Sequence, residues 1–207
     1  MTENGVRRVV TGHRGERSAV AGDHLVEPVV VSALPGYSWH RIWSQDQPPA
    51  AQQGQEGQEG SPPGAGQAHF PPPGGLRFTI YTVPPRGTGP ATAHTAEAGR
   101  ELEQALPGRS RYMEAGQDGM HRTPTLDLIC VLSGDIWLEL DDGEIHLRPG
   151  DCVVQNGTRH AWRNRSDAPC SMAIVLIGAS QPEPGPGPEH RNEHGHEHGH
   201  RHRNEQR

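Results

Sequence analysis

The chain has 207 residues and a formal net charge of −6; 31% of its residues are hydrophobic, and glycine (27) and proline (20) are frequent. This composition indicates one modest core and lacks the basic field that attracts nucleic acid, and the 4% aromatic content is too sparse for a base-stacking surface. No apolar stretch approaches the roughly 18 residues that cross a bilayer, so we expect a cytoplasmic protein with no membrane or nucleic-acid partner.

The first predicted elements, in chain order, are strands. The runs "RRVV", "EPVVVSAL" and "YSWHRIW" in residues 1–43, and "LRFTIYTV" further on, have the β-branched and aromatic content of strands. We expect the strands of residues 1–43 to pack on a barrel and to mediate a homodimer. Residues 44–75, rich in glutamine, glycine and proline, have the composition of a disordered low-complexity insertion loop.

One helix is predicted over residues 95–106, with Thr95 as its cap and Pro107-Gly108 as its stop. We expect this helix to lie across the mouth of a barrel. Residues 126–177 then alternate short β-type runs with turn signals at close spacing, which favours an antiparallel sandwich or barrel with hairpin-sized connections. "DDG" at 141–143 is the clearest hairpin turn among them.

Two further features are read from composition. Cys130, Cys152 and Cys170 lie in or beside apolar runs without metal-type spacing, so we expect buried free thiols. Residues 181–207 hold six of the 14 histidines and are predicted to be a disordered His-rich tail. Such a tract binds nickel, zinc or copper whether or not metal handling is its function. The predicted division is therefore 1–43, 44–75, a barrel domain over 76–180, and 181–207.

Two histidine-containing motifs carry a family resemblance. His121-x-Thr123-x3-Asp127-x6-Gly134 resembles the first motif of the cupin superfamily, whose pattern is His-x-His, three or four residues, Glu, six residues, Gly. Gly157-x2-His160-x3-Asn164, preceded by Pro149-Gly150-Asp151, resembles the second motif. The resemblance spans residues 119–177 and implies a small single-domain cupin of the cupin 2 type. Its fold would be an all-β cupin barrel, a jelly roll extended by N-terminal strands.

The resemblance implies a site made of His121, Asp127 and His160, either as metal ligands or as catalytic residues. Two imidazoles and one carboxylate have the composition of the facial triad of non-haem iron oxygenases, so iron, manganese, nickel or zinc is an implied cofactor. The sequence departs from the family where Thr123 replaces the second histidine, Asp127 the usual glutamate and Gln155 a proline. Aspartate is one methylene shorter than glutamate, so a metal-free site is equally implied.

In the metal-free alternative, Asp127 pairs with His121 or His160 as a general acid/base couple, as in cupin-like sugar epimerases. The same residues could also have purely structural roles. Asp127 could instead cap a turn or pair with Arg122 or Arg163. Trp162, two residues from His160, should share its strand face, as a substrate wall or as core packing. Thr123 and Asn164 are candidate substrate contacts. Asn164 could instead form a turn.

The sequence predicts a small-molecule-metabolising cupin with oxygenase, isomerase or decarboxylase chemistry on a small organic or polyketide-like metabolite. A non-catalytic ligand-binding or sensor cupin is the alternative from another class, because fold does not dictate function. Metal handling through the His-rich tail is the third hypothesis.

Overall fold

The structure is a computed structural model that describes residues 5–14, 17–48, 67–88, 95–117 and 119–180. Within these ranges the chain forms ten strands, one α-helix and one 3-10 helix. The strands are β1 (Val6–Arg14), β2 (Arg17–Val26), β3 (Ser38–Gln45), β4 (Leu76–Val83), β5 (Thr125–Ser133), β6 (Ile136–Leu140), β7 (Gly143–Leu147), β8 (Cys152–Asn156), β9 (Ala161–Arg163) and β10 (Cys170–Gly178). The helices are α1 (Ala96–Ala105) and η1 (Arg109–Tyr112).

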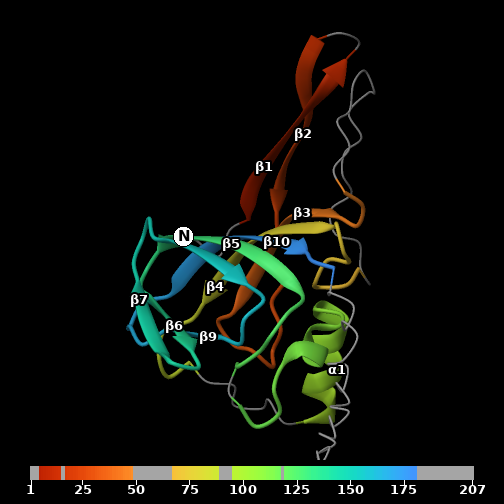
Figure 1. The fold of residues 1–207 in the computed structure, drawn as a ribbon. Helices are drawn as coiled ribbons and strands as arrows, with labels where there is room; N and C mark the ends of the chain where they lie inside the picture. The colour runs from red at the N-terminus through yellow and green to blue at the C-terminus, as the bar shows by residue number, and fades with distance from the viewer. Residues whose placement is uncertain (1–4, 15–16, 49–66, 89–94, 118, 181–207) are drawn as a thin grey trace, which may run out of the picture.

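Two antiparallel sheets form the body of the molecule. One has five strands in the order β3-β4-β10-β5-β8, and the other has three in the order β7-β6-β9. Figure 1 shows the smaller sheet lying against one end of the larger one, with α1 at the side. The predicted all-β class is therefore confirmed, as is the jelly-roll character, because sequential strands switch between the two sheets.

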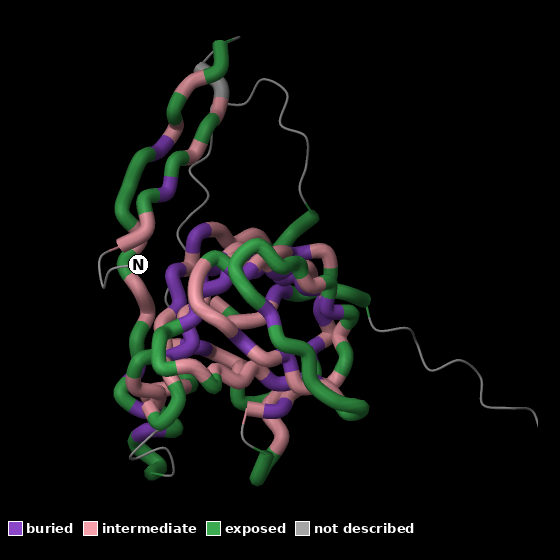
Figure 2. Tube along the Cα trace, turned by 90° about the vertical axis from the view of Figure 1, so that its left-hand side faces the viewer, coloured by how far each residue is buried: buried purple, intermediate pink, exposed green. Residues whose placement is uncertain are grey.

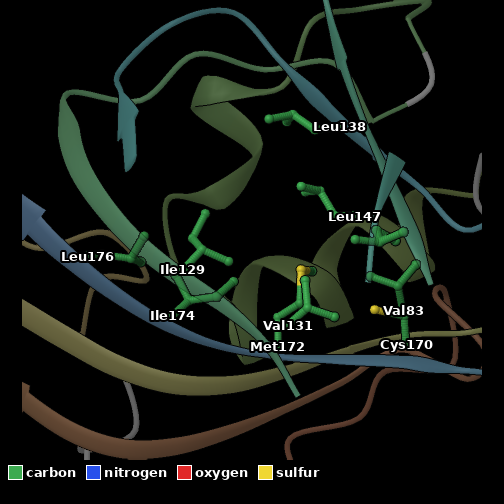
Figure 3. Packing of buried hydrophobic residues seen from close by; sticks show 10 residues of the cluster. Val83, Ile129, Val131, Leu138, Leu147, Cys170, Met172, Ile174 and Leu176 are labelled. Carbon is green, nitrogen blue, oxygen red and sulfur yellow. The ribbon is translucent and has the colours of Figure 1, made fainter. Parts of the chain in front are cut away.

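The core lies between the two sheets. The larger sheet contributes residues such as Val131, Met172 and Ile174, and the smaller sheet contributes Ile136 and Leu138. Figure 3 shows the side chains of Val131, Met172, Ile174 and Leu138 directed into a common interior. The burial of β10 alternates between buried and half-buried positions. This central strand is therefore buried on the face towards the core and half-buried along most of the other face.

The connection between β5 and β6 differs from the hairpins predicted for this region. β5 pairs with β8 and β10, whereas β6 pairs with β7 and β9, so the chain crosses between sheets at Gly134. Gly134 has a φ of 72°, and a Cβ built on it would lie 2.4 Å from the carbonyl oxygen of Pro169. Only glycine fits there without strain. The predicted turn at residues 141–142 does join β6 to β7 as a hairpin.

The N-terminal region departs most from the prediction. β1 and β2 form a two-stranded sheet of their own, which projects from the five-stranded sheet in Figures 1 and 2. Only β3 joins the barrel sheet. The predicted strand "EPVVVSAL" was wrong: within it only Val29 makes a bridge, to Trp39. Pro28 cannot donate to a ladder, and Pro35-Gly36 ends the segment in a turn.

Part of the segment predicted as a disordered loop has defined structure. β3 extends to Gln45, and residues 67–75 lie against the barrel, where the Gly74 amide donates to the Gly178 carbonyl at 2.9 Å. The amide of His69 likewise donates to the carbonyl of Pro107 at 2.8 Å. Residues 49–66 and the His-rich tail, 181–207, lie outside the described residues.

The predicted helix is present, with Thr95 Oγ1 accepting a hydrogen bond from the Ala98 amide at 3.1 Å. Its position differs from the expected barrel mouth. Leu106, fully buried at its end, packs on Val31 and Trp39, which places α1 beside β3. No helix in the described ranges is long and apolar enough to cross a membrane.

The three cysteines are free thiols, but their burial differs from the prediction. Cys170 is fully buried in the core, Cys130 is half-buried and Cys152 is exposed. Cys130 and Cys152 are register partners of β5 and β8. Their strand positions face outward because side chains alternate across a strand, a direction that the apolar content of the runs did not reveal.

Candidate functional site

A pocket between the two sheets gathers the motif residues. Its space of about 80 Å³ is several times that needed for one water molecule. The walls come from β3, β4, β5, β9 and β10, from the segment before β4 and from η1. The lining residues are Trp39, His69, Phe70, Thr79, Tyr81, Arg109, Met113, His121, Asp127, Ile129, His160, Trp162, Ile174 and Leu176.

The two motif histidines are paired directly through their backbones. The amide of each donates to the carbonyl of the other at 2.9 Å, in an isolated antiparallel bridge between His121 and His160. Their imidazole rings lie with centroids 4.2 Å apart. The bridge joins the segment before β5 to the segment before β9, so the two motifs meet at one point although 39 positions separate them.

Both imidazoles are oriented by backbone carbonyls. His121 Nδ1 lies 2.8 Å from the carbonyl oxygen of Gly119, and His160 Nδ1 lies 2.9 Å from that of Thr158. A carbonyl oxygen only accepts, so each contact places the proton on Nδ1 and leaves Nε2 unprotonated. Neither Nε2 takes a hydrogen bond from another described residue. Two basic nitrogens are thereby available to a molecule in the pocket.

Gln155 holds the turn that carries His160. Its Nε2 donates its two protons to Thr158, to the carbonyl at 3.1 Å and to the hydroxyl at 2.5 Å, so neither is left for His160 Nδ1, which lies 2.9 Å away. Gln155 is 3% exposed. The sequence singled out this residue only as a departure from the cupin pattern, and its supporting role is visible only once β8 and the turn are folded. Gly157, with a φ of 60°, lets this turn approach the Thr123 carbonyl, 2.8 Å from where a Cβ would lie.

Asp127 lies on β5 with its side chain buried, 5% exposed. Its Oδ1 has no hydrogen-bond partner among the described residues, and no hydrogen bond joins it to His121 or His160. The predicted Asp–His couple is therefore not formed. The structural alternatives are not formed either: Asp127 is within a strand rather than at a turn, and among the described residues no ion pair joins it to Arg122 or to Arg163, which pairs with Glu139 at 2.6 Å.

The pocket alters the protonation of its groups. Burial, together with the neighbouring imidazole of His160, lowers the pKa of His121 to about 4. Burial also lowers the pKa of His160. The carboxyl group of Asp127 has its pKa raised by burial to about 6. At neutral pH both imidazoles are therefore uncharged bases, and Asp127 titrates closer to neutrality than an exposed aspartate does.

The other predicted site residues differ in whether they line the pocket. Trp162 does share the face of His160: its ring lies 6.0 Å away, edge to face, and it lines the pocket. Thr123 is buried, its hydroxyl 2.8 Å from that of Thr125, and it is not part of the lining. Asn164 bonds the carbonyls of Val83 and Ala168, which is the turn role rather than the substrate contact.

Most of the lining residues were not predicted as site residues, and His69, Phe70 and Arg109 come from segments that were given no role in the site. His69 and Phe70 come from the segment assigned to the insertion loop, and their rings are in edge contact at 4.7 Å. Burial lowers the pKa of His69 to about 3. Arg109 comes from η1. The only local signal was a histidine and an aromatic residue within a stretch otherwise made of glutamine, glycine and proline, which composition alone does not distinguish from a linker.

The donor set does not form the predicted three-ligand metal site. Among the described residues no group of three or more His, Cys, Asp or Glu side chains is placed to hold one ion. The two imidazoles are close together, but Asp127 does not complete a triad with them, and Thr123 turns its hydroxyl to Thr125. The arrangement presents two bases and a separate buried carboxyl group.

Comparison with known proteins identifies the domain. Residues 108–177 match the family described as the cupin domain. The chain therefore carries a cupin domain of the cupin 2 type, and the resemblance carried by the two motifs is confirmed.

Three similar proteins illustrate the range of sequence identity and coverage among the matches. Phomopsin biosynthesis cluster protein C' of Diaporthe leptostromiformis is 54% identical over 68 residues, 30% of this chain and 36% of that protein. Oryzines biosynthesis cluster protein J of Aspergillus oryzae is 40% identical over 119 residues, 51% of this chain and 65% of that protein. The matches thus span about a third and just under two thirds of these relatives. A solved cupin-superfamily sugar phosphate isomerase from Silicibacter pomeroyi aligns at 16% identity and a TM-score of 0.37, over 84% of this chain and 71% of that one.

Proposed function

We propose that this protein is a metabolic enzyme that transfers protons on a small organic molecule, with His121 and His160 as its acid/base pair. The observation that carries the proposal is the orientation of the two rings. Backbone carbonyls hold both Nδ1 atoms, which leaves two unprotonated Nε2 atoms, on rings 4.2 Å apart, for a molecule in the pocket. Relatives named for their biosynthesis clusters support a metabolite as the substrate.

The chemistry follows from the protonation states. One Nε2 accepts a proton from an activated carbon of the substrate, and the resulting imidazolium returns it at a second position. The lowered pKa values keep both rings neutral before substrate binds, and a developing negative charge on the substrate favours the imidazolium. Isomerisation uses both transfers and cyclisation can begin with the first, whereas decarboxylation, in which CO₂ leaves in place of a proton, uses only the delivery of a proton to carbon. Asp127, with an unpartnered Oδ1, is suited to bond a polar group of the substrate.

Metal-dependent oxygenase chemistry is the second candidate, favoured by one observation. Histidines that bind metals usually donate the other ring nitrogen to a carbonyl or carboxylate, as His121 and His160 do here. A divalent ion of iron, manganese, nickel or zinc would supply Lewis-acid or redox chemistry. This candidate requires Asp127 to move into the coordination sphere, because the described residues form no three-ligand group.

Deuterium exchange tests the proposal. The protein, treated with a chelator, is incubated in D₂O with a panel of enolisable oxo acids and aromatic ketones, and NMR follows loss of the C–H signals. We expect exchange that falls about 10²-fold or more in His160→Gln and His121→Gln. The exposed His24 on β2 provides the matched control, since His24→Gln should leave the rate unchanged.

Each other outcome favours another function. Binding of a panel member with no exchange and no product would contradict an enzyme and support the ligand-binding or sensor module. Turnover that appears only when iron or manganese and oxygen are supplied would support the oxygenase.

A further inference from the structure

Arg109 lines the pocket with a cationic side chain that no acidic side chain of the described residues pairs with. It opens η1 directly after Gly108, whose φ of 77° turns the chain from α1 towards the pocket. Among the described residues lining the pocket there is no other arginine and no lysine. Arg109 makes no side-chain hydrogen bond or ion pair with any described residue, whereas Arg159, Arg163 and Arg165 are all paired with carboxylates.

The charge of Arg109 acts on the pocket walls. It contributes to lowering the pKa values of His69 and His121, after burial in both cases. A guanidinium stays protonated at any pH that the protein tolerates, so the charge is permanent. Among the described lining residues Asp127 is the only acid, and its pKa is raised by burial and it does not pair with Arg109. A permanent cation facing a pocket without a counter-ion is a site for an anionic ligand.

The composition of the pocket selects the kind of anion. A guanidinium presents a planar fork of N–H donors that matches a carboxylate through two parallel hydrogen bonds. A phosphate dianion calls for more positive charge than one arginine supplies, and the carboxyl group of Asp127 in the same pocket disfavours a second negative charge. The rest of the lining is largely apolar and aromatic, including Phe70, Tyr81 and Trp162.

We propose that Arg109 binds a carboxylate of the substrate, while the aromatic walls contact its apolar body, so that the substrate is a small apolar or aromatic carboxylic acid. This inference rests on the proposed function, since it names the substrate class of the same pocket. It makes Arg109 the residue that selects the substrate and orients it towards the histidine pair.

Binding of paired probes tests this assignment without knowledge of the natural substrate. Benzoate, phenylacetate and cinnamate are compared with benzamide, phenylacetamide and cinnamamide by ligand-observed NMR titration of the full chain. The two members of a pair have almost the same shape and differ in charge. We expect the acids to bind the unmodified protein at least tenfold more tightly than their amides. In Arg109→Gln this preference should disappear, with amide binding unchanged.

Two further variants separate charge from fold. Arg111 lies on the same 3-10 helix but is exposed, so Arg111→Gln removes one positive charge from η1 and should leave the acid preference intact. Arg109→Lys keeps the positive charge but lacks the planar N–H donors of the guanidinium, so its preference for acids over amides should be intermediate. Equal melting temperatures of Arg109→Gln and Arg111→Gln would show that the change in binding does not come from unfolding.

Three results would overturn the proposal: no acid binds more tightly than its amide, Arg109→Gln retains the preference, or inorganic phosphate displaces the acids more effectively than acetate does. Failure of the proposed function would look different. His160→Gln should lose deuterium exchange while keeping the preference for acids over amides, so the anion site and the acid/base pair are tested separately.

Discussion

His121 and His160 exchange two backbone hydrogen bonds of 2.9 Å, and this bridge places the two motif imidazoles 4.2 Å apart between their centroids. The pairing is a property of the backbone and does not require a ligand. It ties the segment before β5 to the turn before β9, so changes in that turn should be transmitted to the site.

Replacing Gln155 tests this link. In Gln155→Leu the hydroxyl and carbonyl of Thr158 lose their donor, so we expect a loss of about 1–3 kcal/mol in the free energy of unfolding. The His160 ring should also lose its fixed orientation, and ¹⁵N NMR should show a mixture of its two neutral tautomers. Asn156→Ala, at the exposed neighbouring position, is the control. A single Nδ1–H tautomer in Gln155→Leu would contradict the positioning role.

The crossover glycine should be less replaceable than other glycines with positive φ. Gly134→Ala and Gly150→Ala both place alanine in the left-handed region, at a cost of about 1–2 kcal/mol. Only Gly134→Ala also drives a Cβ against Pro169, which adds overpacking of about 1–3 kcal/mol. Urea denaturation of both variants measures the difference, and equal losses would show that the crossover is not tight.

Acid stability should depend on His69. Its folded pKa of about 3 lies below the ordinary value of 6.5, because burial disfavours the cation. The unfolded chain therefore binds a proton that the folded protein does not, and stability is lost as pH falls below 6.5, by up to about 1.4 kcal/mol per pH unit.

We expect His69→Gln to lose less stability than the unmodified protein between pH 7 and pH 5, measured by urea denaturation at both values. His24→Gln, at an exposed position, should behave as the unmodified protein does. An unchanged pH dependence in His69→Gln would mean that water reaches this ring.

Metal content should follow the His-rich tail rather than the pocket. Protein purified without a metal-affinity column is analysed for bound metal as the full chain, as a variant ending at Ser180, and as His121→Ala and His160→Ala in the full chain. We expect the shortened variant alone to lose its nickel, zinc or copper, because six histidines lie beyond residue 180. Iron or manganese in the shortened variant that disappears with either pocket histidine would favour the oxygenase.

The homodimer expected from the N-terminal strands stays a prediction, and the β1–β2 hairpin is where to test it. An isolated two-stranded hairpin is only marginally stable in water, and Val20 and Leu25 on β2 are 57% and 65% exposed. Analytical ultracentrifugation should show a dimer that Val20→Asp with Leu25→Asp converts to monomer. Ile145→Asp, at a position of β7 that is 50% exposed, should remain dimeric. A monomeric unmodified protein would contradict the expectation.

Local sequence patterns were sufficient to predict much of the fold. The run of β-type segments after residue 125, the Thr95 cap and the turn at 141–142 are determined by neighbours in the chain, and all three were predicted. The strand predicted over residues 27–34 was wrong because β-branched residues alone do not provide a partner strand, and Pro28 removes a donor. The predicted strand "RRVV" lies within β1, but its partner β2 was missed because polar residues interrupt the alternation of that strand.

The sequence by itself determined the domain class and two of the site residues, because the two cupin-like motifs mark His121 and His160. Only the tertiary structure decided what surrounds them. Asp127 is separate from the histidines, Asn164 serves a turn, and His69, Phe70 and Arg109 enter the pocket from a presumed linker and from the segment after α1. These relationships depend on contacts between residues far apart in the chain, and the energy of such contacts is set by burial and by the position of partners that no local pattern encodes.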